Sequence, residues 1–245
     1  ASDFWKGLFF AMGQMVDKYS SDFVRWGELY ISIRMANIVI ERIGECTDIT
    51  DFERRDFLGR AYFIRAYSYY TLVMQYGPVP IVPDQAFPTN ASVEEMSYPR
   101  ATYEECVEKI CSDFEQAASL LKSADERDAS TYRIPTSGAA LALMSRVRLE
   151  AASPWFNGNK YYYDFLRSSD NQPYFPQNYD SQKWAIAAVA AKRVINLNLY
   201  NLYTVRSTVS TPELPANTYD PIFNNKGNKF PEGPHGIDPL KSYRD

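Results

Sequence analysis

The helix that ends just before Gly77 constrains the fold of this 245-residue chain more than any other feature. It carries apolar side chains at helical spacing on two opposite faces. One face is made by Leu58, Ala61, Tyr62, Tyr69, Leu72, Val73 and Tyr76, and the other by Phe63, Ala66, Tyr67, Tyr70 and Met74. A helix that is apolar on both faces is typical of one buried between neighbours. Arg65 interrupts the first face, and since an unpaired buried charge is costly, we expect it to pair with a buried carbonyl or carboxylate.

The segment after this helix is predicted to be extended. Gly77-Pro78 ends the helical pattern, and a Val-Pro-Ile-Val-Pro strip follows it. Pro78, Pro80 and Pro83 have no backbone N–H and a fixed φ, which does not suit a central strand. We therefore expect an extended connector between two helices.

Several other helices have clear start signals. Thr50 with Glu53, and Thr102 with Glu105, have the spacing of a capping box, so a helix is expected to begin at each. The first of these runs to Tyr76. The remaining helices are expected over residues 3–19, from about residue 23 to 43, over 138–152 after a cap at Thr136-Ser137, and over 182–196.

This run of helices, without convincing strands, predicts an all-α fold. Ala66, Tyr70, Val73 and Pro78 match the layout of the second helix of a tetratricopeptide repeat, although no clean 34-residue period emerges. We therefore expect tetratricopeptide-like helical pairs in an α-solenoid-like arrangement with long loops. The periodic pattern fails after about Ser207, where Pro and Asn abound, so residues 1–206 are predicted as one helical domain and 207–245 as loop.

Composition and motifs exclude several classes of function. The net charge of −4 with interspersed signs gives no reason to expect nucleic acid as a partner. His235 is the only histidine, no C-x-x-C spacing occurs and no phosphate-binding glycine motif is present, so we predict no catalytic residues, no metal and no cofactor. Cys106 and Cys111 would point about 140° apart on one helix, which makes a disulfide between them unexpected.

Aromatic residues are the compositional outlier, at 15% with 19 tyrosines. A neutral sugar packs its C–H faces on aromatic rings and pairs its hydroxyls with polar side chains, so aromatic loops beside amides are candidate glycan sites. The densest such loop spans residues 153–164 and supplies Trp155, Asn157, Asn159 and Tyr161. Its other interpretation is structural, with Trp155 and Phe156 closing the end of the preceding helix.

A second candidate site is the loop between the first two helices. It carries two aromatic residues, Tyr19 and Trp26, and two charged residues, Asp22 and Arg25. Trp26 also shares a helical register with Leu29 and Ile33, so it fits a core position as well as a ligand contact. Paired carboxylates for glycoside hydrolysis are a third possibility, but none of the acidic residues lies in a recognisable motif.

The helix ending at Tyr76 also carries a family resemblance. Its matching positions are Ala61, Phe63, Arg65, Ala66, Tyr69, Tyr70, Leu72, Val73, Tyr76, Gly77, Val79 and Pro80. With further matching segments in order between residues 20 and 205, the chain resembles the SusD/RagB family, the surface glycan-binding lipoproteins of Bacteroidetes outer membranes. Members of this family contain degenerate tetratricopeptide-like helix pairs and are about twice as long, so the chain resembles their N-terminal half, with residues 207–245 as loop or as the start of the incomplete C-terminal portion.

The resemblance implies a function without catalysis. It implies binding of an oligosaccharide or other nutrient at the cell surface and delivery to a SusC-type TonB-dependent barrel in the outer membrane. A lipid anchor upstream of this chain would hold the protein on the surface. The alternative is a tetratricopeptide-type interaction scaffold that docks on the transporter without touching glycan in this half.

Overall fold

The computed structural model describes residues 25–127 and 132–201, and the helix predicted over 3–19 lies outside them. The α-helices in these ranges are α2 (Trp26–Arg42), α3 (Asp51–Tyr76), α4 (Tyr103–Leu120), α5 (Ser137–Ala152) and α6 (Gln182–Ile195). Two short 3₁₀-helices, η2 (Ile43–Glu45) and η4 (Lys160–Tyr162), follow α2 and α5. Within the described ranges the β-pairing is a single bridge between Leu166 and Pro173. The all-α prediction is confirmed.

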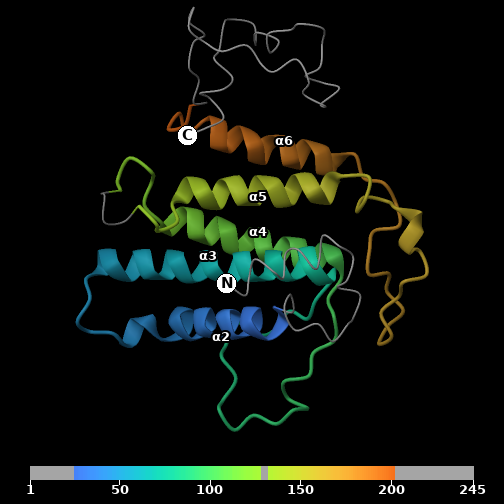
Figure 1. Ribbon diagram of the computed structural model, residues 1–245, viewed down its shortest axis with the longest axis horizontal. Helices are drawn as coiled ribbons and strands as arrows, with labels where there is room; N and C mark the ends of the chain where they lie inside the picture. The colour runs from blue at the N-terminus through green and yellow to red at the C-terminus, as the bar shows by residue number, and fades with distance from the viewer. Residues whose placement is uncertain (1–24, 128–131, 202–245) are drawn as a thin grey trace, which may run out of the picture. The chain divides into compact units, whose positions relative to one another are not determined.

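The helices are stacked side by side in chain order. Each of α2 to α5 packs against the helix that follows it, and neighbouring helices run in opposite directions (Figure 1). This stacking is the α-solenoid-like arrangement that the sequence predicts. The helices belong to one compact unit that ends at Leu197, while the predicted domain boundary after residue 206 lies outside the described residues.

The predicted caps set the helix starts. Thr50 accepts a hydrogen bond from the Glu53 backbone N–H, and the Glu53 carboxylate accepts one from the Thr50 N–H. Thr102 and Glu105 make the same pair at the start of α4, and Thr136 accepts from the Ala139 N–H at the start of α5. Each cap satisfies backbone donors that have no partner inside the helix.

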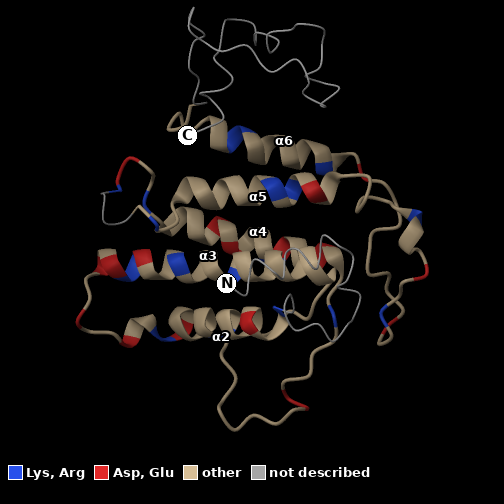
Figure 2. Ribbon diagram, viewed as in Figure 1, with Lys and Arg blue, Asp and Glu red and all other residues tan. Residues whose placement is uncertain are grey.

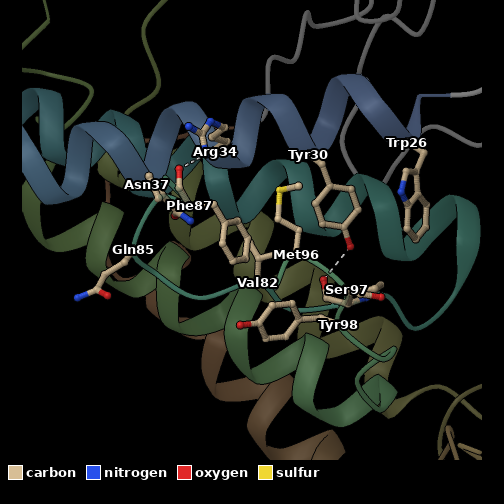
Figure 3. Close-up of a pocket in the computed structure, with 12 residues that line it drawn as sticks. Trp26, Tyr30, Arg34, Asn37, Val82, Gln85, Phe87, Met96, Ser97 and Tyr98 are labelled. Atoms are coloured by element: carbon tan, nitrogen blue, oxygen red, sulfur yellow. Dashed lines mark hydrogen bonds between the residues drawn. The ribbon is translucent and has the colours of Figure 1, made fainter. Parts of the chain in front are cut away.

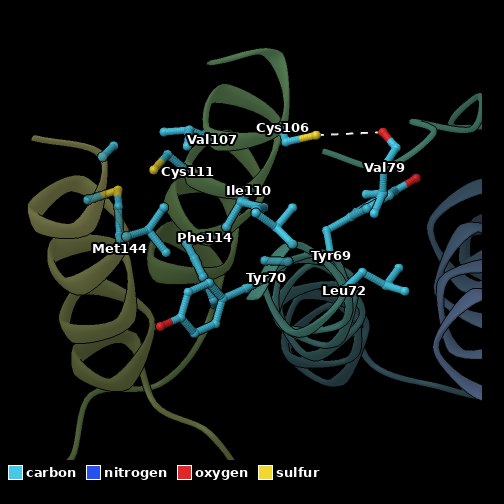
Figure 4. Packing of buried hydrophobic residues seen from close by; sticks show 14 of the residues in the cluster. Tyr69, Tyr70, Leu72, Val79, Cys106, Val107, Ile110, Cys111, Phe114 and Met144 are labelled. Atoms are coloured by element: carbon cyan, nitrogen blue, oxygen red, sulfur yellow. Dashed lines mark hydrogen bonds between the residues drawn. The ribbon is translucent and has the colours of Figure 1, made fainter. Parts of the chain in front are cut away.

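The core lies between α3, α4 and α5 and contains both cysteines of α4 (Figure 4). Tyr69 and Leu72 of α3 and Phe114 of α4 are among its fully buried side chains. Cys106 and Cys111 are buried and unpaired, as predicted, and burial raises their thiol pKa values to about 11 and about 12. They are core residues.

The prediction that α3 is buried on both faces is wrong for part of the second face. Ala66 and Tyr70 are buried, but Tyr67 and Met74 are 49% and 54% exposed. The reason is geometrical, since α3 packs between α2 and α4 and a helix with two flanking neighbours keeps an exposed strip along its length. Some apolar residues of α3 therefore lie outside its interfaces with α2 and α4 and remain exposed.

A buried ion pair ties three helices to the connector. The Arg65 guanidinium donates to both carboxylate oxygens of Asp113 on α4, at 2.8 and 2.7 Å, and to Asn37 Oδ1 on α2, at 2.7 Å. Its Nη1 also lies 2.9 Å from the carboxylate of Asp84, which the Lys109 ammonium contacts at 2.6 Å. The carboxylate partner predicted for Arg65 is thus present. The same guanidinium also contacts a carboxylate of the connector between α3 and α4.

Ion pairs with one exposed partner also link α4 to α5 and to α6. Arg148 of α5 contacts Glu108 of α4, and Lys183 of α6 contacts Glu104 of α4. Basic and acidic residues lie interspersed along the helices (Figure 2). None of the described helices has the length and hydropathy needed to cross a bilayer.

Candidate functional site

A cavity of about 410 Å³ lies between α2 and the connector that joins α3 to α4 (Figure 3). We call it the aromatic pocket. One wall comes from a single face of α2, and the residues on it are Trp26, Tyr30, Arg34 and Asn37. The other wall comes from the connector, and the residues on it are Pro80, Val82, Gln85, Ala86, Phe87, Met96, Ser97 and Tyr98.

The helical repeat explains the first wall. Trp26, Tyr30, Arg34 and Asn37 are spaced by four, four and three residues, so they line up along one face of α2. The neighbouring strip of the same helix supplies Leu29 and Ile33 to the core. Helix α2 therefore presents its core residues to α3 and its pocket residues to the connector.

Side-chain hydrogen bonds hold the second wall in place. The Tyr30 hydroxyl donates to the Pro80 carbonyl at 2.7 Å, the Asn37 amide to the Pro83 carbonyl at 2.9 Å, and Arg34 Nη1 to the Phe87 carbonyl at 2.7 Å. These side chains satisfy backbone carbonyl groups of a segment that is neither helix nor strand. Burial raises the pKa of Tyr30 above its usual value, so the hydroxyl stays protonated and remains a donor.

The aromatic rings of the pocket are fixed by their neighbours. The Trp26 ring lies 5.1 Å from those of Tyr30 and Tyr76, and the Arg100 guanidinium stands over it at 5.6 Å. On the connector, the rings of Phe87 and Tyr98 are 5.9 Å apart. The pocket thus offers immobilised aromatic surface with a guanidinium, an amide and hydroxyl groups around it.

Trp26 lies where both interpretations of the sequence place it, while its contact with a ligand stays a prediction. It packs against the edge of the core and also lines the aromatic pocket. Tyr19, the other residue of that candidate pair, lies outside the described residues. Tyr30, Arg34, Phe87 and Tyr98 were missed by sequence reasoning. The spacing of Tyr30 and Arg34 from Trp26 is visible in the sequence, but the element that faces them is not.

The loop over residues 153–164 does not contribute to the aromatic pocket. Its Asn157 is buried, and the side chain is bonded to backbone groups of Asp180, at 2.8 and 2.9 Å, and of Ala152. Asn159 caps η4 by accepting from the Tyr161 N–H at 2.9 Å and also donates to the Trp155 carbonyl. Both amides therefore hold the loop together in this structure.

The aromatic residues of that loop divide between core and surface. Phe156 stacks on Tyr103 at 4.4 Å, so it closes the end of the core as the structural interpretation expects. Trp155 does not share this role, because it is 56% exposed and meets the edge of the Tyr162 ring. Tyr161 is 78% exposed, and its ring also meets the Tyr162 ring edge to face. Trp155 and Tyr161 are thus available to a ligand, but on an open surface.

Among the described residues no three His, Cys, Asp or Glu side chains are grouped as metal ligands. The lining of the aromatic pocket, drawn from these residues, also contains no Asp or Glu. Its chemistry is that of noncovalent recognition by rings, a guanidinium and neutral polar groups.

Comparison with known proteins places this fold in a family. The model of SusD-like proteins, described as starch-binding and associating with the outer membrane, matches residues 7–149. A SusD-like protein, P38, of Formosa agariphila is 30% identical over 105 residues, which are 42% of this chain and 19% of that protein.

Solved structures agree in fold. The protein BT4246 superposes with a TM-score of 0.63 at 25% identity, over 73% of this chain and 31% of its own. A SusD superfamily protein from Parabacteroides distasonis gives 0.54 at 22% identity, over 76% of this chain and 33% of its own. The chain therefore spans about a third, or less, of the length of these relatives.

Proposed function

Because this chain belongs to the SusD-like family, whose model is described as starch-binding and associating with the outer membrane, we propose that it binds an oligosaccharide at the cell surface without cleaving it. The aromatic pocket is the proposed site. Delivery of the bound sugar to a SusC-type TonB-dependent barrel, and a lipid anchor upstream of this chain, belong to the same proposal.

The observation that carries this proposal is the composition and shape of the aromatic pocket. Its volume of about 410 Å³ falls in the usual range for small-molecule sites, about 300–1,000 Å³. The rings of Trp26, Phe87 and Tyr98 suit the C–H faces of a sugar, and Gln85 and Ser97 suit its hydroxyls. A pocket lined by no carboxylate, as far as the described residues go, does not suit glycoside hydrolysis, which commonly uses two.

The test is a binding titration with an oligosaccharide panel against the wild type and Tyr98→Ala. We expect the wild type to bind a member of the panel and the variant to bind it about tenfold more weakly, since losing a buried ring contact costs roughly 1.5 kcal/mol. Tyr132→Ala is the matched control, because Tyr132 is an exposed tyrosine outside the pocket. Circular dichroism establishes that each variant is folded.

Two results would count against this site. Equal affinity of Tyr98→Ala and wild type would remove the aromatic pocket from the proposal. If Trp155→Ala alone then weakened binding, the site would be the exposed surface of Trp155 and Tyr161.

A second candidate function, an interaction scaffold, is favoured by an apolar groove of about 440 Å³ between α2 and α3. Ile31, Met35 and Ile64 line it and are largely exposed. On this alternative, the helical stack docks on the transporter and this half makes no glycan contact. Copurification with the barrel that is lost in Met35→Glu, while sugar binding is absent from the wild type, would favour it.

A further inference from the structure

Arg34 is the only charged residue among the described residues that line the aromatic pocket. Its Nη1 donates to the Phe87 carbonyl, while its Nε and Nη2 have no hydrogen-bond partner in the part of the chain that the structure describes. No carboxylate of that part lies within ion-pair distance of it either. Arg65, Arg148 and Arg193 differ, since each pairs with a carboxylate of α4. Arg55, like Arg34, bonds a backbone carbonyl instead.

Three acidic groups on or beside the connector have partners other than Arg34. The Glu41 carboxylate accepts from the Ala86 N–H at 3.2 Å, and the Asp84 carboxylate is shared by Arg65 and Lys109. Glu95 accepts from the Ser92 N–H at 2.7 Å. Arg100, behind the Trp26 ring, adds a second cation on this side, with its Nη1 bonded to the carbonyls of Tyr76 and Pro78. Among the described lining residues of the pocket, the Arg34 guanidinium therefore has no carboxylate partner.

We infer that the ligand of the aromatic pocket is an anionic oligosaccharide, whose carboxylate or sulfate group is bound by Arg34. This inference rests on the proposed function and makes its substrate class specific. The Nε and Nη2 edge of a guanidinium matches two oxygens of a carboxylate or sulfate, and such charge-assisted bonds are roughly twice as strong as neutral ones.

The Phe87 carbonyl restricts the position of the Arg34 side chain. By accepting from Nη1 at 2.7 Å, it fixes the guanidinium at the edge of the pocket, next to the Phe87 backbone (Figure 3). Less side-chain freedom is then lost when the anion binds. A sugar whose pyranose face packs on the rings would place a charged substituent at this edge.

The experiment compares chemically matched ligands. One pair is a galacturonic acid oligosaccharide and the same oligosaccharide with its carboxyl groups reduced to hydroxymethyl groups. The other is a sulfated galactose oligosaccharide and its desulfated form. Each is titrated into the full chain as wild type, Arg34→Gln, Arg34→Lys and, as the control, Arg42→Gln. Arg42 lies on the same helix but outside the pocket, so this control loses the same charge.

We expect the wild type to bind the anionic member of at least one pair about tenfold or more tightly than its neutral counterpart. The pair that shows this identifies the anion as carboxylate or sulfate. Arg34→Gln should abolish the preference by weakening the anionic ligand about tenfold more than the neutral one, Arg34→Lys should retain part of it, and Arg42→Gln should leave it unchanged. Raising the salt concentration should reduce the preference.

Three outcomes would overturn the inference in different ways. Equal binding of both members of each pair by the wild type would overturn it and leave the proposed function standing. If Arg34→Gln weakened neutral and anionic ligands equally, Arg34 would act only by holding Phe87. If the folded wild type bound none of the ligands, and none of the wider panel, the proposed function itself would fail.

Discussion

Arg65 shows how one residue joins the fold to the candidate site. Only 2% of it is exposed, and its guanidinium is shared by Asp113, Asn37 and Asp84. Asn37 in turn holds the Pro83 carbonyl of the connector. The position of one pocket wall therefore depends on a charge that is buried in the stack.

We predict that Arg65→Met destabilises the protein by about 3–5 kcal/mol, because the Asp113 carboxylate would stay buried without its partner. Urea denaturation measures this change. Arg193→Met is the control, since it breaks a largely exposed pair with Glu115 and should cost less than about 1 kcal/mol. Similar losses of unfolding free energy in both variants would contradict the prediction that the buried Arg65 pair stabilises the protein more than the exposed Arg193 pair.

The cysteines give a second test at the scale of single residues. Cys46 is exposed, whereas Cys106 and Cys111 are buried and their thiol pKa values are raised by burial. Since the thiolate is the reactive form, only Cys46 among these three should react with a thiol reagent in the folded protein at pH 8. All three should react in denaturant. Rapid native labelling of Cys46→Ser would contradict the burial of the other two.

At the scale of elements, local hydrogen bonds decide where helices begin and end. The capping boxes at Thr50 and Thr102 are readable in the sequence because they involve residues only three positions apart. Gly77 ends α3 with a φ of 70°, a conformation that glycine adopts at little cost. These boundaries need no information from the rest of the fold.

The cap of α4 should depend on pH. The Thr102 backbone N–H donates to Glu105 and holds the pKa of its carboxyl below the usual range, and Arg167 contributes further. The cap therefore stabilises the fold fully above the pKa of an unfolded Glu, about 4.3, and this stabilisation is lost as pH falls through the lower folded value.

We expect Glu105→Gln to lose less stability than the wild type between pH 6 and pH 3, measured from urea midpoints. Glu94→Gln, which changes a connector glutamate outside this cap, should keep the wild-type profile. Parallel profiles of Glu105→Gln and wild type would show that the Glu105 carboxylate has no part in acid sensitivity.

At the scale of the whole molecule, the position of a helix in the stack sets how much of it is buried. Helix α3 packs between α2 and α4, and Leu72 on it is completely buried. On α6, Ala187 and Ala190 are buried, while Val189 is 62% exposed. Two apolar residues can therefore contribute different amounts to stability, because burial depends on the position of their helix in the stack.

We predict that Leu72→Ala lowers the free energy of unfolding by about 2–5 kcal/mol, because it leaves a cavity at the centre of the stack. Val189→Ala should change it by less than about 0.5 kcal/mol, since this side chain is largely exposed. Chemical denaturation followed by circular dichroism measures both. A large effect of Val189→Ala would show that its face of α6 is covered in solution.

The helix boundaries and the extended connector were predictable from the sequence, since caps, prolines and apolar periodicity act over a few residues. It did not determine which aromatic residues meet. Arg34 and Phe87 are 53 positions apart and meet only because the connector folds back over α2. In the loop after α5, Phe156 is packed in the core and Trp155 exposed, although they are adjacent. Tertiary packing decided these outcomes, because burial depends on elements that are distant in the chain.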